Sequence, residues 1–102
     1  MSAVARGNSV DSVTTNHDCT GSTTTSGMSD DVIINGTGVH REGDATVPHG
    51  YPPNPPCAPH APVIATGSTS VFANGLGVAR VGDSYTSSDE VATGSADVFA
   101  GS

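Results

Sequence analysis

Two polar loops carry side chains that are typical of zinc ligands. The first loop spans residues 9–26 and the second spans residues 45–66, and together they contain five candidate ligands: His17, Cys19, His49, Cys57 and His60. Imidazole and thiolate are the ligands of tetrahedral zinc, and the spacing Cys57-x-x-His60 allows both side chains to bind one ion. A site closed by four protein ligands leaves no open position for a substrate, so we expect its role to be structural.

The same residues permit two other interpretations. Cys19 and Cys57 could instead form a disulfide, as small exported domains often do. Alternatively, the loop histidines could hold a catalytic zinc and a water, with Asp18 or Glu90 as the general base. A hydrolase of this kind needs an open fourth position and a pocket, and the chain has few apolar residues with which to wall one. We therefore expect a protein that is not an enzyme.

A repeated unit predicts where these loops lie. The unit is V-I-I-N-G-T-G-V-H-R-E-G-D at residues 32–44 and V-F-A-N-G-L-G-V-A-R-V-G-D at residues 71–83. A third copy is split between the chain ends, because residues 94–101 repeat the opening half and residues 4–8 resemble the closing half. Each loop follows the same end of its unit, so a ring of three units would bring the loops together on one side.

Each unit also carries local signals for a hairpin. The turns Asn35-Gly36 and Asn74-Gly75 accept the positive φ angles of a type I′ turn at little cost. Each unit has one arginine at the same position, followed by Gly-Asp or Gly-Asn, and these are the only basic residues of the chain: Arg6, Arg41 and Arg80. A guanidinium at this position can brace the carboxylate or backbone at the end of the hairpin.

Two parts of the chain are predicted to lie outside the metal site. His40 occupies the unit position that Ala5 and Ala79 hold in the other copies, which predicts an ordinary hairpin residue. The third loop, residues 84–93, has neither His nor Cys, and its larger polar residues are Tyr85, Asp89 and Glu90. We expect this loop to contribute shape only.

Composition sets the broad class of the protein. A chain of 102 residues with 34% hydrophobic and 4% aromatic residues predicts a single domain, residues 1–102, with a thin core. Thirteen Gly, seven Pro and no helical apolar spacing predict a mostly β fold with little or no helix. A net charge of -7 with three basic residues excludes the usual electrostatic footprint for nucleic acid or an anionic membrane. No apolar run is long enough for a signal peptide or a membrane span.

The repeated unit V-F-x-N-G-x-x-x-A-R-x-G-D, the preceding Gly-Ser, the split third copy and the His/Cys loops resemble the PAAR-repeat family. The Pro-Ala-Ala-Arg segment that names the family corresponds here to Gly77-Val78-Ala79-Arg80. The similarity extends over nearly the whole chain. It implies a small β-rich cone with pseudo-three-fold symmetry, seated on the trimeric β-helical spike of a contractile injection machine with one chain per trimer.

Members of that family bind one zinc ion near the apex through three histidines and one cysteine. The resemblance therefore implies a structural zinc held by His17, His49, His60 and Cys57, with Cys19 as the alternative cysteine. It also implies a tip that pierces the target cell envelope. From the acidic charge we expect no nucleic-acid partner, and we expect no small-molecule substrate. The short chain and its acidic Ser/Thr-rich loops favour the tip of a phage tail baseplate over a type VI secretion tip without an effector domain. Either tip would be made in the host cytoplasm without a signal peptide.

Overall fold

The computed structural model describes residues 1–51 and 57–101. These residues form short strands, turns and irregular segments, so the prediction of a mostly β fold without helix is confirmed. Accordingly, the described part contains no helix that could span a membrane. The strands are β1 (Ser2–Ala3), β2 (Ser12–Thr14), β3 (Ser22–Thr24), β4 (Ile33–Ile34), β5 (Thr37–Gly38), β6 (His49–Tyr51), β7 (Ala58–His60), β8 (Phe72–Ala73), β9 (Leu76–Gly77), β10 (Glu90–Val91) and β11 (Phe99–Ala100).

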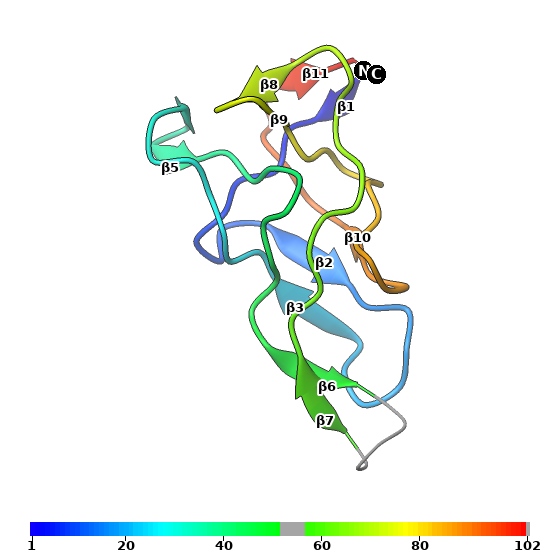
Figure 1. Ribbon diagram of the computed structural model, residues 1–102. Coiled ribbons are helices and arrows are strands. Elements are labelled where there is room, and N and C mark those ends of the chain that lie inside the picture. Colours follow the sequence, from blue (N-terminus) through cyan, green and yellow to red (C-terminus); the bar gives the residue numbers. More distant parts are fainter. Residues whose placement is uncertain (52–56, 102) are drawn as a thin grey trace.

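Three small antiparallel hairpins lie at one end of the molecule (Figure 1). β4 pairs with β5 and β8 pairs with β9, each across an Asn-Gly turn. The turn residues have φ angles of 50° and 81° at Asn35 and Gly36, and of 55° and 79° at Asn74 and Gly75. Such left-handed angles are accessible to Asn and Gly at little cost, which is why these dipeptides close the hairpins. The predicted turns are therefore confirmed.

The third hairpin is made from the two ends of the chain. β1 pairs with β11 in antiparallel register, with Ser2 opposite Ala100 and Ala3 opposite Phe99. The backbone N–H of Val4 then donates to the carbonyl of Val98 at 2.9 Å. The split repeat thus closes the ring, as the sequence predicted.

A triangle of backbone hydrogen bonds marks the pseudo-three-fold axis. The N–H of Ala5 donates to the carbonyl of Ala79 at 2.9 Å, that of Ala79 to His40 at 2.8 Å, and that of His40 to Ala5 at 3.0 Å. All three residues are fully buried. They hold the same position in their units, so a repeat in the sequence has become a rotational repeat in space.

The core is thin, as the composition predicted, and it follows the same symmetry. One of its two clusters contains one valine from each unit, Val4, Val39 and Val78, together with Ala73 and Ala100. The other cluster lies nearer the loops and contains Ala5, Val13, Ile64, Ala79, Tyr85 and Val91. Burying one valine side chain contributes roughly 1.5–3 kcal/mol to the free energy of unfolding. A core of so few and such small side chains needs additional restraints from polar contacts and cross-links.

Arginine–aspartate pairs supply some of these restraints at the end of each unit. Arg41 forms a forked pair with Asp44, and Arg80 forms one with Asp83. The shortened third unit has Asn8 at the aspartate position, and Arg6 pairs instead with Asp11 at 2.9 and 3.0 Å. The predicted bracing role is therefore confirmed, with a substitute carboxylate in the shortened unit.

Each guanidinium also reaches a neighbouring unit, at the residue that directly follows the first strand of its hairpin. Nη1 of Arg41 donates to Oδ1 of Asn74 at 3.0 Å, and Nη1 of Arg80 donates to the carbonyl of Gly101 at 2.7 Å. Nη1 of Arg6 completes the set with Oδ1 of Asn35 at 3.5 Å. The three arginines therefore tie the hairpins into one ring.

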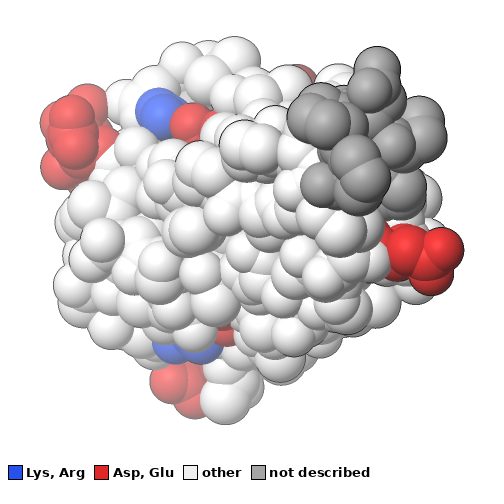
Figure 2. Space-filling model, turned by 90° about the horizontal axis from the view of Figure 1, so that it is seen from below, with Lys and Arg blue, Asp and Glu red and all other residues white. Residues whose placement is uncertain are grey.

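The molecule narrows away from the three hairpins. It measures 38 × 23 × 23 Å along its principal axes. The β10-β2-β3 sheet occupies the middle, and the β6–β7 pair lies at the end opposite the hairpins (Figure 1). Viewed from below in Figure 2, most of the visible surface carries neither acidic nor basic side chains, and the charged groups lie toward its edges.

Candidate metal centre

Three histidines and one aspartate from three separate loops meet near the narrow end. His17 follows β2, His49 begins β6, His60 ends β7, and Asp89 immediately precedes β10. Antiparallel pairing of β6 with β7 places His49 directly opposite His60. One ligand atom from each of the four residues lies within 4.8 Å of the others, so the group can hold a metal ion. We call these four residues the histidine–aspartate group.

The contacts inside the group are short and shielded from solvent. Nε2 of His17 lies 3.0 Å from Oδ1 of Asp89, and Nε2 of His49 lies 2.8 Å from Oδ2. Nε2 of His60 lies 2.8 Å from Nε2 of His49. The Asp89 side chain is fully buried, and that of His60 is the most exposed of the four at 22%. A carboxylate buried this deeply requires a positive partner.

Backbone carbonyls fix the tautomer of two of the histidines. Nδ1 of His17 lies 2.8 Å from the carbonyl of Asp18, and Nδ1 of His49 lies 3.0 Å from the carbonyl of Val47. A carbonyl can only accept, so Nδ1 carries the hydrogen in both rings. In the neutral imidazole Nε2 then presents a lone pair, which here faces the carboxylate oxygens of Asp89. Two acceptors at this distance require a cation or an additional proton between them.

The geometry favours a cation at a shared point. Nε2 of His17 and Oδ2 of Asp89 are both buried without a hydrogen-bond partner, although each has a short contact within the group. These two atoms therefore make short contacts without hydrogen-bond geometry, as expected for ligand atoms that face a common position, whereas the Nε2 atoms of His49 and His60 are within hydrogen-bond distance of each other. Burial, together with the neighbouring His49, lowers the pKa of His60 and so favours its neutral, metal-binding form.

The donor set and its spacing suit a small divalent ion. A tetrahedral ion with bonds of about 2.0–2.1 Å places its ligand atoms about 3.4 Å apart. The contacts that the structure shows between 2.8 and 3.9 Å bracket this value. Three imidazole nitrogens and one carboxylate oxygen are accepted by several divalent metals, and the carbonyl contacts at Nδ1 are typical of metal-binding histidines.

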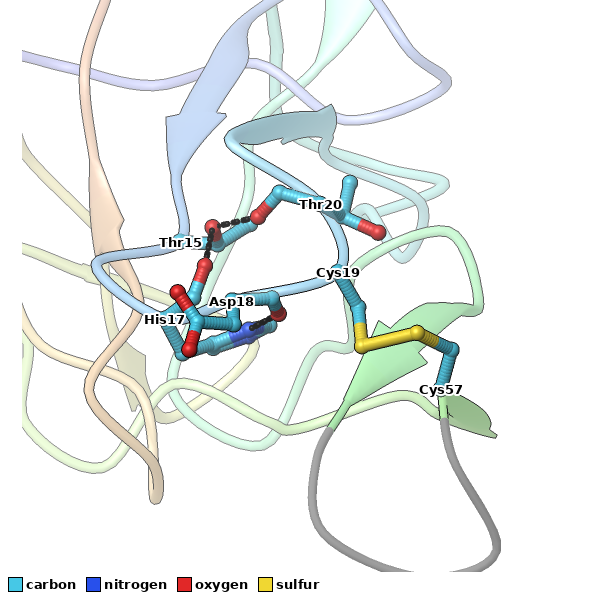
Figure 3. The surroundings of a disulfide bond; sticks show 6 residues. All are labelled: Thr15, His17, Asp18, Cys19, Thr20 and Cys57. Carbon is cyan, nitrogen blue, oxygen red and sulfur yellow. Dashed lines mark hydrogen bonds between the residues drawn. A yellow bond between two sulfur atoms is a disulfide. The ribbon is translucent and has the colours of Figure 1, made fainter.

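The structure contradicts the prediction that Cys57 is a metal ligand. Its sulfur is bonded to that of Cys19, with the two Cα atoms 5.5 Å apart, so neither residue offers a thiolate. Figure 3 shows that this disulfide joins the loop that carries His17 to Cys57, the residue directly before β7. The same bond excludes Cys19 as the alternative ligand, and the disulfide that the sequence left open is the observed arrangement.

The prediction that residues 84–93 contribute shape only is wrong, because Asp89 supplies the fourth group. Oγ of Ser87 donates to Oδ1 of Asp89 at 3.0 Å and orients the carboxylate, and the carbonyl of Asp89 accepts from the N–H of Tyr85 at 2.9 Å. The His and Cys residues of the first two loops gave no sign of this residue. The signal that could have identified Asp89 was the expected convergence of all three loops, since carboxylates also bind zinc.

His40 lies outside the group, in agreement with the prediction. Its Nδ1 donates to the carbonyl of Gly27 at 2.7 Å, so its Nε2 accepts from the hydroxyl of Tyr85 at 2.8 Å in the neutral ring. Burial lowers the pKa of His40, and burial also raises the pKa of Tyr85. The pair is a buried polar connection between the axis of the ring and the third loop.

The lowered pKa of His40 predicts a loss of stability at acid pH. Both folded and unfolded chains carry neutral His40 above the ordinary pKa of about 6.5. As the pH falls through that value, the unfolded chain takes up a proton that the folded chain resists, so the free energy of unfolding decreases. We expect the decrease between pH 7 and 5, measured by urea denaturation, to be smaller in His40→Gln than in the wild type. An equal decrease in both proteins would contradict this role of His40.

Asp18 and Glu90, considered above as general bases, are not members of the histidine–aspartate group. Residues 1–51 and 57–101 enclose no pocket for a ligand. The arrangement can hold an ion between four protein side chains.

In comparisons with known proteins, the chain matches no model of a protein family and no curated protein.

Proposed function

We propose that this protein is a spike tip, which caps the end of a trimeric β-helical spike in a contractile injection machine and forms a metal-stabilised apex. The observation that carries the proposal is the polarity of the molecule. Three equivalent hairpins lie at one end, and the histidine–aspartate group lies toward the other, narrower end (Figure 1).

The hairpin end presents a repeated apolar surface. One large apolar residue occupies the same unit position in each hairpin, and all three are exposed: Ile33 at 51%, Phe72 at 56% and Phe99 at 48%. Single exposed apolar residues are common, but a set repeated by symmetry indicates an interface. We call Ile33, Phe72 and Phe99 the hairpin triad.

A trimeric β-helix is a partner that fits this surface. Its blunt end exposes three strand edges and an apolar interior, related by a three-fold axis. A monomer with internal three-fold repetition can meet all three chains with similar contacts. The binding ratio is then one copy of this protein to three copies of the spike chain.

The narrow end gives the tip its mechanical role. We propose zinc as the ion of the histidine–aspartate group, since three imidazoles and a carboxylate form a closed tetrahedral set for zinc. A closed site joins three loops at the apex and stiffens a fold whose core is thin. The force of sheath contraction then falls on a small, rigid area of the target envelope.

The phage tail baseplate is the setting we favour, and the tip of a type VI secretion system is the alternative. In both settings the tip caps a trimeric spike and transmits the force of sheath contraction to the target envelope. The acidic Ser/Thr-rich loops and the lack of a basic patch support a role that is structural and does not involve nucleic acid.

Native mass measurement tests the docking directly. Mixed with a truncated trimeric β-helical spike, the protein should form a complex that contains one copy per trimer, because one pseudo-three-fold face covers one three-fold end. Three copies per trimer would show that each spike chain binds separately and would contradict the proposal. A trimeric coiled coil without a β-helical end is the matched control and should form no complex.

A further inference from the structure

The disulfide lies beside the backbone that carries the histidines. Cys19 is two residues after His17, and Cys57 is three residues before His60. The Cβ atoms of both cysteines lie 3.3 Å from the place that a Cβ on Gly50 would occupy, and Gly50 directly follows the remaining histidine. The cross-link therefore joins the loop that carries His17 to the β6–β7 pair, which carries the other two histidines (Figure 3).

Both cysteines hold an unusual backbone conformation. Their φ angles are 81° at Cys19 and 59° at Cys57. Left-handed angles are unfavourable for side chains other than Gly, Asn and Asp, and such residues persist only where their surroundings hold them. When the cross-link is broken, both loops can relax toward ordinary angles. Such a relaxation would move the residues next to the ligands.

The disulfide is more accessible than the ligands it restrains. Cys19 and Cys57 are both exposed, whereas the His17 and His49 side chains are only 7% and 4% exposed. A reducing agent in solution can therefore approach these two exposed residues without entering the histidine–aspartate group. Imidazole and carboxylate ligands do not form disulfides, so oxidation of the cysteines leaves the donor set intact.

We propose that the Cys19–Cys57 disulfide is a redox latch for the metal ion: it holds the histidine loops in place when formed, and it lets the ion exchange when reduced. Reduction breaks the S–S bond and forms two thiols, with two electrons and two protons taken from a dithiol that becomes a disulfide itself. Metal would load while the thiols are reduced and would be retained after oxidation. The inference rests on the metal-binding part of the proposed function and is independent of docking.

The rate of zinc release tests the latch. Oxidised, zinc-loaded protein is mixed with excess EDTA, and release is followed with and without a phosphine reductant, because a dithiol would itself bind zinc. Restraints around metal ligands typically change affinity by about 10–100-fold, so we expect reduction to accelerate release roughly tenfold or more. The double variant Cys19→Ser/Cys57→Ser should release zinc at the fast rate in both conditions.

Each other outcome overturns part of the inference. Equal release from oxidised and reduced protein, with zinc bound in both, would overturn the latch alone. Slower release after reduction would also overturn it, since free thiolates would then be acting as ligands. If zinc binds in neither state, the metal-binding part of the proposed function is wrong together with the latch. The melting temperature of each loaded protein provides a readout independent of the chelator.

Discussion

Replacing Asp89 with asparagine is expected to weaken metal binding by at least roughly 100-fold, because the neutral amide removes the anionic ligand of the histidine–aspartate group while preserving the shape of the side chain. A 100-fold loss of affinity removes about 2.7 kcal/mol of metal-linked stability at a fixed metal concentration. For a domain of this size, that corresponds to a fall in melting temperature of roughly 10 °C or more.

In the absence of metal, the Asp89→Asn substitution should not lower the stability of the protein. Without an ion, the buried carboxylate of Asp89 faces the lone pairs of His17 and His49, and Oδ2 lacks a hydrogen-bond partner. The amide that the substitution introduces can donate to these nitrogens, so we expect the metal-free Asp89→Asn protein to be at least as stable as the metal-free wild type. Elemental analysis and thermal melting, each with and without EDTA, measure both effects.

Asp18→Asn is the matched control for this substitution. Asp18 is exposed and adjacent to His17, but its carboxylate is not part of the histidine–aspartate group. The control should keep its metal and its melting temperature. Full metal content in Asp89→Asn, combined with loss of metal in Cys57→Ser under reducing conditions, would instead assign the fourth ligand to the cysteine.

Charged substitutions in the hairpin triad are expected to abolish docking on the spike. Central apolar residues of an interface commonly contribute about 2 kcal/mol each when truncated. The single variants Ile33→Asp, Phe72→Asp and Phe99→Asp should therefore each weaken binding roughly 30-fold or more, by similar factors, because the three positions are equivalent. The triple variant should show no complex in a titration followed by native mass measurement.

Folding and metal binding should survive these changes. The triad side chains are about half exposed, and surface substitutions typically alter stability by no more than about 0.5 kcal/mol. Val10→Asp is the control, since Val10 is similarly exposed at 45% and lies outside the three hairpins. A triad variant that binds as tightly as the wild type would show that the spike does not contact this face.

The repeat and its turns could be predicted from the sequence, since they depend on neighbouring residues. Asn35-Gly36 and Asn74-Gly75 can adopt positive φ angles that most dipeptides avoid, so the hairpins follow from local conformational preference. Matching halves at the two ends also predicted the β1–β11 pair, because a strand half without a local partner must find its complement elsewhere. The Arg41–Asp44 and Arg80–Asp83 pairs followed from the fixed spacing within their units, whereas the Arg6–Asp11 pair of the shortened unit did not.

The convergence of His17, His49 and His60 also followed from the sequence, because loops that leave equivalent ends of a ring meet on one side. Which other side chain completes the group did not follow. Cys57 and Asp89 lie on loops that both reach the narrow end, and the sequence does not specify which of the two faces the histidines.

Only the tertiary structure determines whether Cys57 or Asp89 faces the three histidines. Pairing of β6 with β7 directs His49 and His60 inward, while Cys57 precedes β7 on the exposed side and meets Cys19. Pairing of β10 with β2, together with the Ser87 contact, buries Asp89 among the imidazoles. The sequence therefore determined the ring, its turns and the side on which its loops meet. The membership of the histidine–aspartate group depended on contacts between loops that are far apart in the sequence, which no local pattern specifies.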